Sequence, residues 1–102
     1  MARTVVFNLG WLPGAPREVA TCTTTTLTAL EAALQLLAPA GLVLITCYPG
    51  HTGGDREAAA VQEWAAALSP RSFFVWRMGQ LNVTPDAPFC LLIQDGRPSD
   101  VR

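Results

Sequence analysis

The sequence carries almost no excess of charge of one sign. Seven basic residues stand against eight acidic ones, which gives a net charge of −1 at pH 7. Proteins that hold nucleic acid through its phosphates usually present a basic surface, because neutralising phosphates releases bound counterions. The composition therefore indicates no generally basic surface that would bind RNA or DNA. Any contact with RNA would have to come from a local patch or from another component.

Cysteines are few and show no pairing pattern. The chain has three, Cys22, Cys47 and Cys90, and no two of them are spaced as Cys-x-x-Cys. Such a set indicates neither a zinc site nor a disulfide framework. Cys47 and Cys90 lie within apolar, strand-like runs, where a free cysteine behaves as a small buried hydrophobe. Reduced thiols are typical of the cytoplasm, so we predict a cytoplasmic protein without a bound metal.

Long hydrophobic runs are also missing. No apolar stretch approaches the roughly 20 residues that a membrane-spanning helix needs. Residues 1–3 lead directly into a strand-like segment without the pattern of a signal peptide. We therefore expect no membrane association. Half of the 102 residues are hydrophobic and only 15% are charged, a balance that indicates one small globular domain and excludes a disordered chain.

Turn residues divide the chain into six expected elements. β-Branched and aromatic runs predict four strands, and apolar residues at spacings of three and four predict two helices. Strands are expected at about 4–8, 42–48, 73–78 and 89–94. The first helix carries Leu27, Leu30, Leu34 and Leu37 and ends before Pro39-Ala40-Gly41; the second carries Ala58, Val61, Trp64, Ala65 and Leu68 and ends near Ser69-Pro70. The hydroxyls of Thr23–Thr26 and the carboxylate of Asp55 are candidate helix caps.

The order of these elements, βαβαββ, predicts an α/β fold. We expect a Rossmann-like half-domain over residues 1–94 with two main helices and about four strands, mostly parallel and with a final hairpin. The strand at 42–48 is continuously apolar, as a strand covered on both faces would be. Residues 95–102 are expected to form a flexible tail.

One stretch combines a strand with an abrupt polar turn. Residues 4–8 are β-branched or aromatic up to Asn8, and Leu9-Gly10-Trp11-Leu12-Pro13-Gly14 follows, where Gly and Pro prevent the strand from continuing. This places an amide and an aromatic ring at the carboxyl edge of the sheet, where open α/β sheets bind ligands. Alternatively, Asn8 ties down its own loop through hydrogen bonds to the backbone, and Trp11 packs over that loop.

A second loop follows the strand at 42–48. Tyr48-Pro49-Gly50-His51-Thr52-Gly53-Gly54 contains three glycines and the only histidine of the chain. His51 is placed where a substrate-facing residue would be, although a single histidine is more often structural. The glycines allow close approach of the backbone to a ligand, or they only form a turn. No Lys-Ser/Thr pair follows them, so this is not a phosphate-binding loop.

Four motifs occur in a fixed order: Phe7-Asn8-Leu9-Gly10-Trp11-Leu12-Pro13-Gly14, then Thr24-Thr25-Thr26 at a helix start, then the loop 48–54, then Pro88-Phe89 before the last strand. From about Arg3 to Gln94 they resemble the carboxyl-terminal half of a family of class I S-adenosylmethionine-dependent methyltransferases. The family is rRNA-methylase-like and includes enzymes that methylate 5-aminomethyl-2-thiouridine at the wobble position of tRNA. The resemblance implies that the last strand is inserted antiparallel between its neighbours.

The resemblance also implies methyl transfer from S-adenosylmethionine to an amine of tRNA or another RNA. Such an amine has to be neutral, with its lone pair aimed at the methyl group. An Asn amide and nearby carbonyls can accept the amine's hydrogens, and an aromatic ring can stack on the base. The implied catalytic residues are Asn8 and His51, the implied partial cofactor site is Asn8 and Leu9, and the implied substrate site is Leu9, Gly10, Trp11, Leu12, Pro13, Tyr48 and Gly50. The chain has Asn-Leu-Gly-Trp where amino-methyltransferases often carry Asn-Pro-Pro-aromatic.

The cofactor-binding half of the resembled fold has no counterpart here. Such methyltransferases bind the cofactor through a glycine-rich turn, and no Gly-x-Gly follows any predicted strand. We therefore expect that the chain alone does not bind S-adenosylmethionine. We also expect the first strand to lie at an exposed edge that recruits a second copy, as a homodimer, or a partner chain. Two alternatives stay open: a non-catalytic remnant that serves protein association, and a small nucleotide-binding module built on His51.

Overall fold

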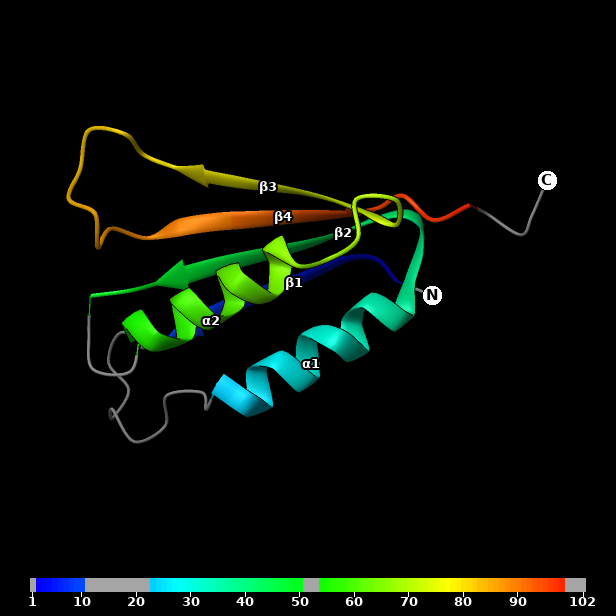
Figure 1. Cartoon of the computed structure of the whole chain (residues 1–102), viewed down its shortest axis with the longest axis horizontal. Helices are drawn as coiled ribbons and strands as arrows, with labels where there is room; N and C mark the ends of the chain where they lie inside the picture. The colour runs from blue at the N-terminus through cyan, green and yellow to red at the C-terminus, as the bar shows by residue number, and fades with distance from the viewer. Residues whose placement is uncertain (1, 11–22, 51–53, 99–102) are drawn as a thin grey trace.

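The computed structural model describes residues 2–10, 23–50 and 54–98. Within these residues, four strands and two helices follow one another in the order β1, α1, β2, α2, β3, β4 (Figure 1). Their bounds are β1 Ala2–Gly10, α1 Thr23–Leu36, β2 Leu37–Tyr48, α2 Gly54–Ala66, β3 Phe73–Gly79 and β4 Phe89–Asp95. The predicted α/β fold with four strands and two helices is confirmed.

The four strands form one sheet in the order β1-β2-β4-β3. β1 and β2 are parallel, whereas β4 runs antiparallel to both β2 and β3. The last strand is thus inserted between β2 and β3, as the family resemblance implied, and β3 and β4 form the predicted hairpin. β1, β2 and β3 consequently point in the same direction, so their carboxyl ends lie at one edge of the sheet.

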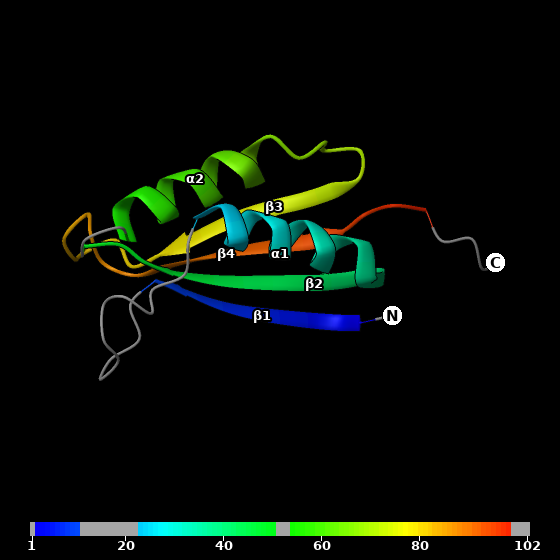
Figure 2. The same cartoon turned by 90° about the horizontal axis from the view of Figure 1, so that it is seen from below.

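Both helices cover the same face of the sheet (Figures 1 and 2). The two crossovers, from β1 to β2 and from β2 to β3, step across the sheet in the same direction, and crossovers of one hand then place their helices on one side. Alternate residues of the strands are buried beneath the helices: Leu9, Val43, Ile45, Cys47, Phe89, Leu91 and Ile93. The helices add Leu30, Ala33, Leu34, Ala58, Val61 and Ala65. The core is therefore one layer between the sheet and the helices.

The junction of α1 and β2 differs from the prediction. Leu37, expected as the last apolar residue of the helix, is the first residue of β2 and pairs with Ala2. Pro39 has no amide hydrogen for a helix, and it disfavours helical backbone at the residue before it. Ala40 adopts a positive φ of 63°. Leu37 is nevertheless only 2% exposed. The apolar spacing therefore predicted correctly that Leu37 is buried, but wrongly that it is helical.

Gly41 follows this turn at a point where β1 and β2 come close together. A Cβ atom at this position would lie 2.8 Å from the carbonyl oxygen of Ala38 and 3.2 Å from those of Ala2 and Arg3. The pairing of β1 with β2 also shifts in register between Ala2 and Thr4. Glycine is therefore required here by close backbone approach.

Three strands and one helix also have bounds that differ from the predicted ones. β1 covers Ala2–Gly10 rather than 4–8, because its pairing with β2 continues to the last residue of each strand. β3 and β4 each extend one residue further than expected, to Gly79 and Asp95. α2 ends at Ala66, before Ser69-Pro70, and the amide of Leu68 bonds to the Ala65 oxygen in a tightened last turn. Element types were thus predicted more accurately than their ends.

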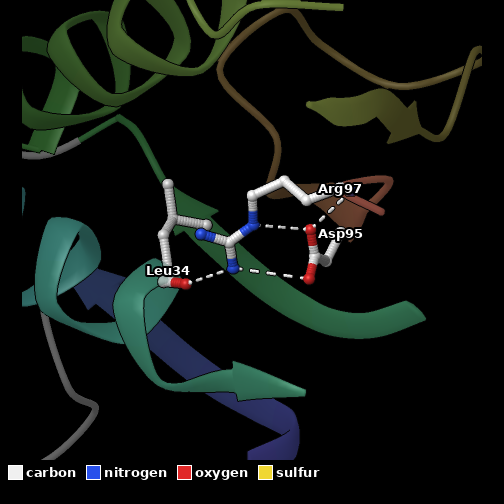
Figure 3. Close-up of polar contacts among 3 residues, drawn as sticks. All are labelled: Leu34, Asp95 and Arg97. Carbon is white, nitrogen blue, oxygen red and sulfur yellow. Dashed lines mark hydrogen bonds and ion pairs between the residues drawn. The ribbon is translucent and has the colours of Figure 1, made fainter. Parts of the chain in front are cut away.

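Asp95 and Arg97 join the end of β4 to the end of α1 (Figure 3). Arg97 donates from Nε to Asp95 Oδ1 at 2.8 Å and from Nη2 to the carbonyl oxygen of Leu34 at 3.0 Å. Leu34 lies in the last turn of α1, where carbonyl groups lack a helical partner. Asp95, expected as the first residue of a flexible tail, is the last residue of β4, and a half-buried ion pair holds Arg97 beside it. Residues 99–102 lie outside the described residues.

Replacing Arg97 by alanine should lower the free energy of unfolding by about 1–3 kcal/mol, because Asp95 is 5% exposed and would lose its charged hydrogen-bond partner. Burial raises the pKa of Asp95, but the hydrogen bonds and charge of Arg97 outweigh this effect and hold the pKa below its ordinary 3.8. The stabilisation is therefore complete above pH 3.8 and is lost as the pH falls through the lower folded value. Thermal unfolding at neutral and at acidic pH measures both effects.

Arg71→Ala is the matched control, because Arg71 is exposed. It removes the same charge without touching a buried carboxylate, so we expect almost no change in melting temperature. An equal drop in melting temperature for Arg97→Ala and Arg71→Ala at neutral pH would contradict the assigned role of the ion pair.

Candidate functional site

The carboxyl ends of β1 and β2 lie side by side at one edge of the sheet (Figure 2). Their parallel register pairs Asn8 with Thr46 and Gly10 with Tyr48. The two loops singled out in the sequence, after Asn8 and after Tyr48, therefore leave the sheet from neighbouring strands. Open α/β sheets bind ligands at this edge, so we place the candidate site here.

Successive residues at this edge point to opposite faces of the sheet. Leu9 is 5% exposed and belongs to the core under the helices, so its side chain cannot reach a ligand and only its backbone can take part in binding. Asn8 is exposed and Tyr48 is half-buried, both on the other face. The amide of Asn8 is therefore accessible, as its proposed roles toward substrate and cofactor require.

Gly50 follows the end of β2 by two residues and adopts a backbone conformation that favours glycine. Its φ is +91°, and its amide donates to the Asp55 carboxylate at 2.7 Å. A Cβ atom on Gly50 would lie 3.3 Å from both the carbonyl oxygen and Oδ2 of Asp86. The loop between β3 and β4 thus contributes Asp86 to the wall of the site. Only its position in a turn-rich segment pointed to this residue in the sequence. Asp55, predicted as a cap of α2, accepts the hydrogen bond that holds Gly50.

A buried hydrogen bond connects the first turns of the two helices. The Thr26 hydroxyl donates to Glu57 Oε2 at 2.8 Å, and these residues are only 2% and 3% exposed. α1 and α2 each begin after one of the two site loops, so this bond fixes the starting points of both helices relative to each other. Thr26 was expected to be part of a helix cap; it instead points inward. Glu57 was missed, because a glutamate in a first helical turn is normally read as exposed.

Cys47 lies beneath the site as the partner of Leu9 in the sheet. Its side chain is fully buried. Burial away from water, together with the smaller effect of the nearby negative charge of Glu57, raises the pKa of the Cys47 thiol to about 11. Cys47 is therefore a neutral core residue at physiological pH, as predicted, and not a nucleophile.

Several predicted site residues lie outside the described residues. These are Trp11, Leu12, Pro13 and His51, and Cys22 is among the others. Their roles stay predictions. Within residues 2–10, 23–50 and 54–98, no group of three or more His, Cys, Asp or Glu side chains is arranged to hold a metal ion. In the same part of the chain, neither helix is long and apolar enough to cross a membrane.

A cleft of about 470 Å³ opens between α2 and β3, away from the carboxyl ends of β1 and β2. Its lining is mostly apolar and includes Ala65, Leu68 and Val75. No acidic, histidine or cysteine side chain lines it. The cleft therefore offers neither a nucleophile nor an acid–base pair, and the strand ends remain the better candidate for chemistry.

Similarity to known proteins agrees with the geometry of the strand ends. A family model described as "Putative rRNA methylase" matches residues 1–94, which include both site loops. The chain belongs to this rRNA methylase family. The resemblance based on the motifs at 7–14 and 48–54 is thereby confirmed.

Individual proteins that are similar to this chain agree with the family assignment. A chloroplastic tRNA (mnm(5)s(2)U34)-methyltransferase of Arabidopsis thaliana is 40% identical over 86 residues, covering 84% of this chain. A "putative rRNA-methylase" of Clostridium thermocellum has a TM-score of 0.86 at 30% identity. A "putative methyltransferase" of Streptococcus mutans, solved in complex with SAH, has a TM-score of 0.82 at 36% identity. Each of these two structures matches 91% of this chain.

The chain spans only part of the length of these relatives. It spans 50% of each of the two solved chains and 31% of the plant methyltransferase. A large part of each relative therefore has no match in this chain. What the described residues contribute is the edge of the sheet from which the two site loops leave.

Replacing Gly50 by alanine should destabilise the protein by about 1–2 kcal/mol, because a left-handed conformation strains any residue with a Cβ atom. Thermal unfolding measures the loss. Gly79→Ala is the control, since Gly79 has no positive φ and a Cβ there would meet mainly the flexible Arg77 side chain at 3.3 Å. Equal destabilisation by the two changes would show that the conformation of Gly50 is not the cause.

The raised pKa of Cys47 predicts a loss of stability at alkaline pH. The thiol ionises near pH 9.0 in the unfolded chain and near pH 11 in the folded protein. The stabilisation is complete below pH 9 and is lost as the pH rises to about 11. Between pH 9 and pH 11, the free energy of unfolding of wild type should fall by on the order of 2–3 kcal/mol more than that of Cys47→Ala. Denaturant unfolding measures the difference; identical pH profiles of wild type and Cys47→Ala would contradict it.

Proposed function

We propose that the chain forms the substrate-facing half of an S-adenosylmethionine-dependent RNA methyltransferase site. The observation that carries this proposal is the parallel pairing that brings the loops after Asn8 and Tyr48 together in a member of the rRNA methylase family. The name of the plant relative supports the aminomethyl group of a wobble uridine in tRNA as the acceptor. The SAH complex of the Streptococcus mutans relative supports the cofactor.

In the proposed reaction the amine nitrogen attacks the methyl group in line with the departing sulfur. The amide oxygen of Asn8 and the backbone carbonyls of Leu9 and Gly10 accept the hydrogens of the amine and aim its lone pair. His51 takes the proton of an ammonium substrate or hydrogen-bonds the nucleotide. The cofactor, when bound, supplies an electrophilic methyl group. Asn8 and the backbone of Leu9 are the groups of this chain that would touch it.

The remaining residues form the proposed wall around the nucleotide. Trp11 stacks on the base, with Leu12 and Pro13 beside it, because stacking on an aromatic ring suits an unpaired base. Tyr48 and Gly50 line the end of the neighbouring strand, β2. Placing these groups around the amine excludes water, which favours transfer to nitrogen over side reactions.

The cofactor site is proposed to need further protein. No Gly-x-Gly follows a strand of this chain, so the glycine-rich turn of the family would come from a partner chain or a second copy. The outer edge of β1 is where we propose that it attaches, since β1 pairs only with β2 in the described sheet. With a net charge of −1, the chain would also rely on that partner for attraction to RNA. A cytoplasmic location, predicted from the cysteines, is part of the same proposal.

A methyl-transfer assay tests the proposed function. The chain is co-expressed with the part of the Streptococcus mutans methyltransferase that it does not match, called here the completing fragment. The acceptor is tRNA with 5-aminomethyl-2-thiouridine at the wobble position, and the donor carries a labelled methyl group. We expect transfer to that uridine, and a loss of about 10²–10³-fold in kcat with Asn8→Ala, because a group that orients the reacting amine is removed.

Gln35→Ala is the control for this assay, because Gln35 is exposed near the end of α1, opposite the proposed site. It should retain the wild-type rate. Transfer that survives Asn8→Ala unchanged would reject the catalytic role of Asn8. A complex that forms but transfers no methyl group to this tRNA would reject the proposed reaction.

A further inference from the structure

The cleft between α2 and β3 borders the edge of the sheet that β3 forms. α2 packs mainly on β1 and β2, so it leaves the helix-facing side of β3 partly uncovered (Figure 1). Apolar side chains line the resulting cleft, among them Ala66 at the end of α2, Leu68 just after it and Val75 of β3. A cleft of about 470 Å³ is large enough to hold a ligand or several side chains of a partner.

The outer edge of β3 is free to accept one more strand. β3 is the last strand in the sheet order, and within the described residues it pairs only with β4. That pairing runs from Phe73 to Gly79 without a bulge, and the strand contains no proline. Bulges and prolines are devices that keep edge strands from pairing further. β3 therefore presents a regular row of unpaired peptide groups directly beside the cleft.

Arg77 supplies a positive charge at one end of this cleft. Its Nε donates to Oε1 of Gln62 on α2 at 3.0 Å, and its guanidinium carbon lies 4.2 Å from the centre of the Phe89 ring. Both contacts position the guanidinium, but neither brings a negative charge. Over residues 2–10, 23–50 and 54–98, the ion pair that forms is Arg97 with Asp95, which leaves Arg77 without a carboxylate partner there.

We propose that an extended peptide segment of a partner protein pairs with the outer edge of β3 and places alternate side chains in this cleft. A strand beside β3 lies about 5 Å away, and every second residue of it falls next to Phe73, Val75 or Arg77. The residues next to Phe73 and Val75 are apolar, and the residue next to Arg77 is acidic. Main-chain hydrogen bonds supply affinity in such a complex, and the cleft supplies specificity.

Other occupants satisfy fewer of these features. Two copies paired through β3 would bring two Arg77 side chains to the same face, and β3 has no acidic residue to pair with them. A small carboxylic acid with an apolar body would fill the cleft and meet Arg77, but it would leave the edge of β3 unpaired. The proposal is independent of methyl transfer, because the cleft lies away from the carboxyl ends of β1 and β2.

Selection of a displayed library of random peptides on the chain tests the proposal. The enriched peptides should share two apolar residues and one acidic residue at alternating positions. Arg77→Glu should weaken the binding of such a peptide tenfold or more, since like charges then face each other. Selection on Arg77→Glu itself should enrich Lys or Arg at the acidic position. Ala66→Trp, which narrows the cleft at an exposed residue, should also weaken binding tenfold or more.

Arg3→Glu and Ala67→Trp are the matched controls. Arg3 is exposed on β1 at the opposite edge of the sheet, and Ala67 is exposed beside Ala66 but does not line the cleft. Both variants should bind the selected peptide as tightly as wild type. Circular dichroism of each variant reports whether its fold is intact. Hydrogen exchange of the β3 amides should slow when the peptide binds, because an added strand pairs with that edge.

Three results would overturn this inference. The first is a selection that enriches no peptide, including one in which decanoate alone binds the cleft, which would identify a small carboxylic acid as the occupant. The second is enriched peptides that bind Arg77→Glu and Ala66→Trp as tightly as wild type. The third is a bound peptide that slows hydrogen exchange in β1 and leaves β3 unchanged.

Discussion

The structure depends on burying one face of β2 beneath two helices. Val43, Ile45 and Cys47 have no measurable exposure, and the helix residues that cover them, such as Leu30 and Val61, are equally buried. In a chain of 102 residues this single layer is most of the apolar surface removed from water, which is the dominant favourable term in folding. The helices can cover only one side, so the other side of the same strands stays partly exposed.

β2 also places the candidate site. Because β1 runs parallel to it, the loops that precede α1 and α2 leave the sheet at the same edge. The Thr26–Glu57 hydrogen bond then fixes the two helix starts together, and Asp55 holds Gly50 at the end of β2. The candidate site thus lies at the end of a strand whose helix-facing side chains are fully buried, but it contains groups from one side only. The chain belongs to the rRNA methylase family and covers half of each solved relative. Both facts agree with a site that has groups on one side only.

The sequence predicted the element types and the meeting of the ends of β1 and β2 at one edge, because apolar periodicity and Gly/Pro turns are local signals. It misplaced Leu37, where the turn at Pro39 and Ala40 overrides a helical spacing that fits burial equally well. It missed the hydrogen bond from Arg97 to the carbonyl group of Leu34, since no local pattern reveals a partner 63 residues away. Asp86 and Glu57 were missed for the same reason: their partners are distant in the chain. The insertion of β4 came from the family resemblance, because periodicity does not report strand order.

The most direct test of the central claim is a calorimetric titration of SAH into the purified chain by itself. If the chain holds only the substrate-facing half of the site, no binding heat should be detected, and micromolar binding should arise once the completing fragment is present. Micromolar binding by the chain alone, abolished by Asn8→Ala, would contradict the account, because it would mean that these strands and loops already form a cofactor site without further protein.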